Sequence, residues 1–195
     1  LSTGDNVNAN INMAISSTAS SGIATLTLRD IGGRFFTDGN ISATTLSVDN
    51  TVHDVSFTGG TNAFTNAVTF QNDGTLELGN SASDTFSFGG GVTENTTGTV
   101  TLASAISSSN DAISFGAVTL GSATSIDTNA TSNVADITIA AITGGSNNLT
   151  LSTGNNIAGA DITASGAISG LGNLILADVG GTATFSNNVA AAALS

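Results

Sequence analysis

The residues of this chain that could perform chemistry are its carboxylates, a single histidine and two arginines. The sequence holds 14 Asp and Glu, 1 His and 2 Lys and Arg. Hydrolysis of a glycosidic bond needs two clustered carboxylates, one as the acid and one as the base or nucleophile. Here the carboxylates are scattered singly between apolar segments: Asp49, Asp54, Asp73, Asp84, Asp111, Asp127, Asp136, Asp161 and Asp178. Such scatter favours aspartates that hydrogen-bond turns over aspartates that catalyse.

His53 is followed directly by Asp54, which suggests a catalytic dyad. Neighbouring residues of a strand point to opposite faces, so the sequence instead predicts a surface histidine. Asp49, Asn50 and Asp54 could together offer oxygen ligands to Ca²⁺. The glycine-rich calcium nonapeptide G-G-x-G-x-D is absent, however. We therefore assign no catalytic, cofactor-binding or metal-ligating residue and expect no cofactor.

Arg29 and Arg34 are the only residues that could serve as the basic group of a polysaccharide lyase. Each lies near an acid, Asp30 or Asp38, so we expect surface ion pairs. Phe35 and Phe36 follow Arg34, and we expect one of the two rings to be stacked in a core. The alternative is that the pair forms an exposed interaction site. Trp and Tyr, which dominate many binding surfaces, are absent.

The composition excludes several classes of partner. With a net charge of −12 and 2 basic residues, the chain cannot neutralise a phosphate backbone, so we expect no nucleic acid partner. No run of about 18 apolar residues is present, and we expect no membrane insertion. Cysteine is absent, which leaves no redox or zinc-thiolate site. Hydrophobic residues make up 39% of the chain, enough to favour folding over disorder.

Short segments of alternating apolar and polar residues recur along the chain. Examples are Leu26-Thr27-Leu28, Val68-Thr69-Phe70, Val100-Thr101-Leu102, Ile137-Thr138-Ile139 and Leu149-Thr150-Leu151. Alternation with β-branched and aromatic residues predicts strands with one buried face. Gly, Asn, Asp and Ser separate these segments, and they supply the positive φ angles of tight corners. Proline, which cannot donate to a strand ladder, is absent.

Equivalent positions of these segments recur with a period of 18–25 residues. Val48 and Phe70 lie 22 residues apart, and Leu78 and Leu102 lie 24 apart. That period is the length of one coil of a β-solenoid. Roughly nine coils, stacked at about 4.8 Å, would form a rod of roughly 40 Å. The same period could stack Asp49 on Asp73 and Asp111 on Asp136, although aspartates capping corners would explain the pattern equally well.

The sequence therefore predicts an all-β fold, a right-handed parallel β-helix that forms one segment over residues 1–195. Antiparallel sandwiches are the competing architecture. Strands of three or four residues and pervasive self-similarity favour the solenoid. The phrase Leu-Ser-Thr-Gly opens the chain at residues 1–4 and returns at residues 151–154. Because neither end resembles a cap, we expect a segment cut from a longer repeat array.

Three stretches carry a resemblance to a known kind of protein: GGSNNLTLSTGNNI (144–157), DITASGAISGLGNLILADVGGTATFSNNV (161–189) and AISFGAVTLGSATSIDT (112–128). They resemble the repeats of filamentous-haemagglutinin-like and autotransporter-passenger-like bacterial surface adhesins. The resemblance covers most of the chain in style and has no diagnostic motif. It implies a right-handed β-helix on the bacterial surface and carries over no functional residue.

From these observations we expect a non-catalytic structural or adhesive segment of an extracellular bacterial surface protein. Its host or matrix ligand, if any, is not identified by the sequence. The alternative is a subunit that associates end to end through uncapped coils into a filament, sheath or surface layer. A polysaccharide-active β-helix enzyme is the third and least supported interpretation.

Overall fold

The computed structural model describes residues 1–4, 9–13, 20–132 and 135–195. Within these ranges the regular structure is entirely β, and no helix there is long and apolar enough to cross a membrane. The strands are β1 (Ile11–Met13), β2 (Ser20–Leu28), β3 (Ile31–Thr37), β4 (Ile41–Val48), β5 (Val52–Phe57), β6 (Thr61–Phe64), β7 (Val68–Phe70), β8 (Leu76–Leu78), β9 (Thr85–Phe88), β10 (Val92–Glu94), β11 (Val100–Leu102), β12 (Ala105–Ser108), β13 (Ile113–Leu120), β14 (Thr124–Asp127), β15 (Ile137–Thr143), β16 (Leu149–Ser152), β17 (Ile162–Ala164), β18 (Ile168–Ala177), β19 (Ala183–Phe185) and β20 (Val189–Leu194).

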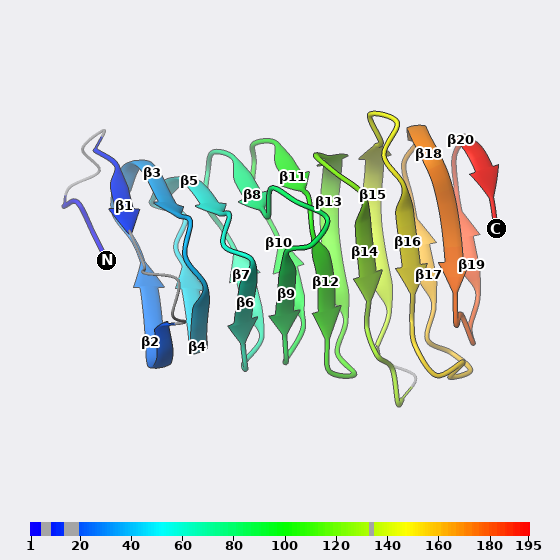
Figure 1. Ribbon diagram of the computed structural model, residues 1–195, viewed down its shortest axis with the longest axis horizontal. Helices are drawn as coiled ribbons and strands as arrows, with labels where there is room; N and C mark the ends of the chain where they lie inside the picture. The colour runs from blue at the N-terminus through cyan, green and yellow to red at the C-terminus, as the bar shows by residue number, and fades with distance from the viewer. Residues whose placement is uncertain (5–8, 14–19, 133–134) are drawn as a thin grey trace.

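The strand pairings are parallel, and they form three ladders along the long axis of the molecule (Figure 1). The first ladder runs β1-β3-β5-β8-β11-β13-β15-β18-β20. The second runs β2-β4-β7-β10-β13-β15-β17-β19. The third runs β2-β4-β6-β9-β12-β14-β16-β18-β20. Long strands such as β13 belong to two ladders because their two halves pair with different neighbours.

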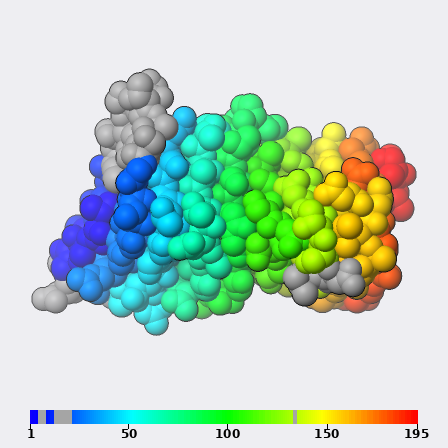
Figure 2. Space-filling model, turned by 90° about the horizontal axis from the view of Figure 1, so that it is seen from below, coloured from blue at the N-terminus to red at the C-terminus, as the bar shows by residue number. Residues whose placement is uncertain are grey.

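The first ladder gives the coil length directly. Its rungs are Ile11, Phe35, Val55, Leu76, Val100, Val118, Ile142, Ile168 and Val189, so successive coils differ by 18 to 26 residues. These nine rungs enclose about eight turns. The parallel β-solenoid predicted from the repeats is confirmed, with one coil longer than the predicted range. In Figure 2 the coils form contiguous bands from the N-terminal to the C-terminal end.

The alternation of residues fixes which side chains enter the core. In β7, Val68 and Phe70 are buried while Thr69 is exposed, and β10 and β17 repeat the inward-outward-inward order. One hydrophobic cluster extends from Leu26 to Leu174. Its bulkiest part is a group of six rings whose centroids lie 5.4–6.5 Å from their neighbours: Phe35, Phe57, Phe64, Phe70, Phe86 and Phe88. Phe35 is thus the core ring expected of the Phe35-Phe36 pair.

The corners use the residue types predicted for them. Asn110 and Asn129 adopt positive φ angles of 69° and 48°, which short polar side chains tolerate. Gly79 has a φ of 82°, and a Cβ placed there would lie 2.5 Å from the carbonyl oxygen of Ala103 in the next coil. A residue without a side chain is therefore required at that corner for two coils to approach each other.

Candidate functional site

Charged side chains gather on the first ladder, near its N-terminal end. β5 pairs with β3 on one side and with β8 on the other, so three consecutive coils share this face. It carries Arg34 from β3, His53 and Asp54 from β5, Asp73 from the corner after β7, and Glu77 from β8. We call these five residues the charged cluster.

Arg34 links three coils of the charged cluster. Its Nη2 atom donates a hydrogen bond to Oε2 of Glu77 at 2.8 Å, and its guanidinium carbon lies 5.0 Å from the ring centroid of Phe36. Oγ of Ser56 donates to the same Glu77 oxygen at 2.6 Å. The expected ion pair of Arg34 with nearby Asp38 is wrong, because the partner comes from two coils further on. Because both charged side chains are partly exposed to solvent, this ion pair contributes about 1 kcal/mol or less to the stability of the fold.

Arg29 behaves differently from Arg34. It is exposed, and its backbone N–H donates to the carbonyl oxygen of Leu1 at 3.1 Å. No carboxylate of the described residues forms an ion pair with Arg29, so the expected pairing with Asp30 is not seen among them. Asp30 itself adopts a φ of 51° and occupies a corner. Arg29 thus lies outside the charged cluster, whereas Arg34 lies beside its acids Glu77 and Asp54.

His53 pairs with an acid of the next coil. Its Nδ1 atom lies 2.8 Å from Oδ1 of Asp73, and both side chains are more than half exposed. The hydrogen bond to Asp73 raises the pKa of His53 above 6.5, and the charges of Asp54 and Asp73 add to the rise, while partial burial opposes it. The surface histidine expected from the sequence is confirmed. The partner of His53 is Asp73, which lies 20 residues away in the sequence. The hydroxyl groups of Ser56 and Thr75 donate to the carboxylates of Glu77 and Asp54, respectively.

Asp54 is held by the following coil. Burial favours the neutral carboxyl group, but the backbone N–H and the hydroxyl group of Thr75 both donate to its Oδ1, at 2.7 and 2.8 Å. Together with the charges of His53 and Arg34, these bonds lower the pKa of Asp54 below 3.8. Its contribution to stability is therefore present above pH 3.8 and is lost as the pH falls through the lowered pKa. Asp54 serves as a link between coils.

The same link recurs along the solenoid. An Asp or Asn side-chain oxygen accepts a hydrogen bond from a backbone N–H group of the following coil. The pairs are Asn10 with Arg34, Asn40 with Thr61, Asp54 with Thr75, Asn110 with Thr131, Asp136 with Asp161, Asn148 with Asn173, and Asp161 with Thr182. Aspartates in hydrogen bonds at corners were expected, but their reach from one coil to the next was not.

The two stacked aspartate pairs considered from the sequence are wrong. The backbone N–H of Asp73 donates to the carbonyl oxygen of Val52, which places Asp73 beside His53. Asp49 instead accepts a hydrogen bond from Thr51 within its own corner. Ile113 pairs with Ile137, so Asp136 is level with Ala112 and not with Asp111. The physical reason is the variable coil length, which shifts positions by several residues. The stacked pair that the structure does contain is Asp136 and Asp161.

The oxygen atoms considered from the sequence as ligands of Ca²⁺ are already engaged. Asp49 and Asp54 accept hydrogen bonds from Thr51 and Thr75, respectively. Across residues 1–4, 9–13, 20–132 and 135–195, no three His, Cys, Asp or Glu side chains lie close enough to hold a metal ion. The calcium site considered at Asp49, Asn50 and Asp54 thus gains no geometric support.

Glu94 is a carboxylate that sequence analysis did not single out. It ends β10 at an inward position, paired with the buried Phe70, and is 7% exposed. Its carboxylate accepts hydrogen bonds from the backbone N–H groups of Thr96 and Gly116, the latter at 2.8 Å. Burial of a charge requires such bonds. Glu94 therefore joins its coil to the next, like the Asp and Asn links.

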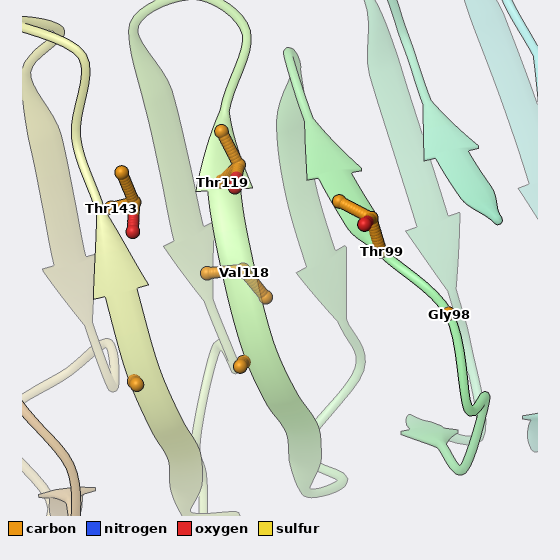
Figure 3. Close-up of a pocket in the computed structure, with 7 residues that line it drawn as sticks. Gly98, Thr99, Val118, Thr119 and Thr143 are labelled. Atoms are coloured by element: carbon orange, nitrogen blue, oxygen red, sulfur yellow. The ribbon is translucent and has the colours of Figure 1, made fainter.

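A shallow depression of about 260 Å³ lies on the first ladder, over β11, β13 and β15. Figure 3 shows Thr99, Thr119 and Thr143 on three neighbouring segments of chain at this place. Its other lining residues are Gly98, Ala117, Val118 and Ala141. The lining holds no acid or base, so this surface offers hydroxyl groups and small apolar side chains for contact only.

No protein-family model matches the chain, and no curated protein or solved structure shows significant similarity to it. The structure agrees with the resemblance at the level of architecture, because it is a β-solenoid of the kind that β-helix repeat proteins have. The resemblance to adhesins and autotransporter passengers remains a prediction.

Proposed function

We propose that this chain is a structural rod, a non-catalytic stalk or passenger segment of an extracellular bacterial β-helical surface protein. The observation that carries the proposal is the continuity of the three parallel ladders, which run through about eight turns. In each ladder the backbone hydrogen bonds join one coil to the next and thus lie along the rod. Such a rod resists extension because several backbone hydrogen bonds join each coil to the next.

The side chains support the same interpretation. Charged and amide groups of the charged cluster and of the Asp and Asn links bond one coil to another. The interior holds one extended apolar cluster and a small second one formed by Ala130, Ala135 and Ala160. Stability therefore comes from stacking, without disulfides, since the chain has no cysteine. An extracellular location rests on the resemblance to surface exoproteins.

Labelling of intact cells tests the location. An antibody raised against the folded chain is applied to intact and to lysed cells of the organism that produces the protein. We expect equal labelling of both, and loss of the label after brief protease treatment of intact cells. Labelling that requires lysis would contradict an extracellular rod. A cytoplasmic protein of the same cells is the control for integrity.

End-to-end assembly of copies is the second candidate function, because parallel ladders can be continued in the same direction by the strands of another chain. Among the described strands, β19 pairs only with β17 and β20 only with β18. Val189 is 41% exposed and Leu194 is 67% exposed on this edge. Exposed strand edges with apolar side chains pair readily with other chains.

A further inference from the structure

Two buried side-chain oxygen atoms have no hydrogen-bond partner among the residues that the structure describes. They are Oδ1 of Asn72 and Oγ1 of Thr96. Asn72 is 0% exposed and lies in the corner between β7 and β8, and Thr96 lies in the corner between β10 and β11. A buried polar atom without a partner costs free energy, so each of these oxygens points to a ligand from outside the chain.

The amide group of Asn72 is held in one orientation by its nitrogen. Nδ2 donates to three backbone carbonyl oxygens at 2.9–3.3 Å, those of His53, Gly74 and Thr75. Exchanging the nitrogen and the oxygen would place Oδ1 against the same three carbonyl oxygens, so the oxygen is the free atom. Asn62 is equally buried, but its Oδ1 accepts a hydrogen bond from a backbone N–H group. The free oxygen is therefore particular to Asn72.

Asn72 and Thr96 occupy equivalent positions in two adjacent coils. β7 pairs with β10 before the corner, and β8 pairs with β11 after it, both at an offset of 24 residues. Between these strands the hydroxyl group of Thr97 donates to the carbonyl oxygen of Asp73 at 2.7 Å, again at that offset. Thr96 therefore lies level with Asn72 in the next coil. Equivalent positions of adjacent coils are about 4.8 Å apart.

Glu94 places a negative charge beside these oxygens. It is 7% exposed, and its carboxylate accepts a hydrogen bond from the backbone N–H of Thr96, so the two residues are in contact. The ion pairs formed within residues 1–4, 9–13, 20–132 and 135–195 do not include Glu94. Backbone donors solvate the carboxylate but leave its net charge uncompensated. Buried charges are normally paired with an opposite charge or bound to a metal ion.

We propose that a hard divalent cation of the Ca²⁺ type binds between these two coils. Its protein ligands are Oδ1 of Asn72, Oγ1 of Thr96 and the carboxylate of Glu94. All three are oxygen donors, which Ca²⁺ takes at about 2.3–2.6 Å. A cation midway between two oxygens about 4.8 Å apart lies about 2.4 Å from each, a distance that suits Ca²⁺ and is too long for Mg²⁺.

The surroundings favour a cation at this corner. The net charge of −12 raises the concentration of cations around the whole molecule. Thr96 is only partly buried, so a cation can enter from solvent. Unlike the carboxylates of Asp49 and Asp54, the two free oxygens accept no hydrogen bond from the described residues. The site is a link between coils and does not depend on where the rod is located.

Isothermal titration calorimetry with CaCl₂, on protein freed of metal with EDTA, tests the site directly. We expect one site per chain. Thermal denaturation followed by circular dichroism should show a Tm raised by roughly 3–6 °C when free Ca²⁺ is about tenfold above its Kd. Both measurements are made at constant ionic strength, with MgCl₂ for comparison. Mg²⁺ should bind more weakly than Ca²⁺.

Glu94→Gln keeps the size of the side chain and removes its charge, so it should weaken Ca²⁺ binding tenfold or more. Asp84→Asn is the matched control, because Asp84 is also a buried carboxylate, 6% exposed, that accepts hydrogen bonds from backbone N–H groups. This control loses the same charge and should bind Ca²⁺ like the parent. Circular dichroism verifies that both variants keep their strands.

Thr96→Val separates a bound cation from a direct hydrogen bond between Thr96 and Asn72. A direct bond would be lost in the variant, which would lower the Tm in EDTA. We expect an unchanged Tm in EDTA and no rise with Ca²⁺, because the hydroxyl group has no partner within the described part of the chain. Three results would each overturn the proposal: a parent that does not bind Ca²⁺, equal binding by Glu94→Gln and Asp84→Asn, or a lowered Tm of Thr96→Val in EDTA.

Discussion

His53 is the residue of the charged cluster whose environment can be measured most directly, because the chain has one histidine. The hydrogen bond to Asp73 raises its pKa above 6.5. The pair of protonated His53 with Asp73 therefore stabilises the fold fully below pH 6.5, and this stabilisation is lost as the pH rises through the pKa of His53 in the folded state. Since both side chains are more than half exposed, the pair acts as a surface link.

Asp73→Asn tests this link. We expect the pKa of His53 to fall toward 6.5, because the variant removes the charged acceptor of the hydrogen bond. Proton NMR titration of the histidine ring measures the pKa, and Asp38→Asn, an exposed acid outside the cluster, is the control. An unchanged pKa in Asp73→Asn would mean that His53 and Asp73 do not pair in solution.

Asp136 represents the Asp and Asn links between coils. Asp136→Ala leaves the backbone N–H of Asp161 without its acceptor, and we expect a loss of about 1 kcal/mol in the free energy of unfolding. Asp136→Asn keeps an acceptor oxygen and should lose clearly less. Urea denaturation measures both variants. Equal losses would show that the charge and not the hydrogen bond matters.

Strands and corners are the elements most accessible to prediction. The alternation in segments such as Val68-Thr69-Phe70 correctly predicts a strand and its buried face, because each residue of a strand points to the face opposite its neighbour's. The partners of charged residues could not be predicted. Arg34 meets Glu77 two coils away, and a coil length that varies from 18 to 26 residues hides that position. Glu94 was missed because a charge at an inward position contradicts the pattern.

Gly79→Ala tests the packing of corners. The substitution combines a φ of 82° with a Cβ only 2.5 Å from the carbonyl oxygen of Ala103. We expect a loss of about 2 kcal/mol or more, from backbone strain and displacement of the adjacent coil. Gly145→Ala is the matched control, since its φ is also positive but its nearest neighbours lie 3.7 Å away, and it should lose about 1 kcal/mol. Equal effects in denaturation would contradict close coil contact at Gly79.

At the scale of the whole molecule the core is uneven. The six clustered phenylalanines lie between Phe35 and Phe88, and mainly aliphatic residues, together with Phe115, fill the coils that follow. Phe57→Ala removes the ring that contacts Phe35, Phe64 and Phe86, and we expect a loss of about 3–5 kcal/mol. Thermal denaturation followed by circular dichroism measures it. A loss below about 1 kcal/mol would contradict the burial of this ring cluster.

Each coil of the solenoid contacts mainly its neighbours, so the molecule behaves as a one-dimensional array. Pulling a single molecule by its two ends tests the central claim, a rod held together coil by coil, most directly. We predict stepwise extension in multiples of one coil, about 60–90 Å for 18–26 residues. A single rupture that releases the whole chain at once would contradict a solenoid rod.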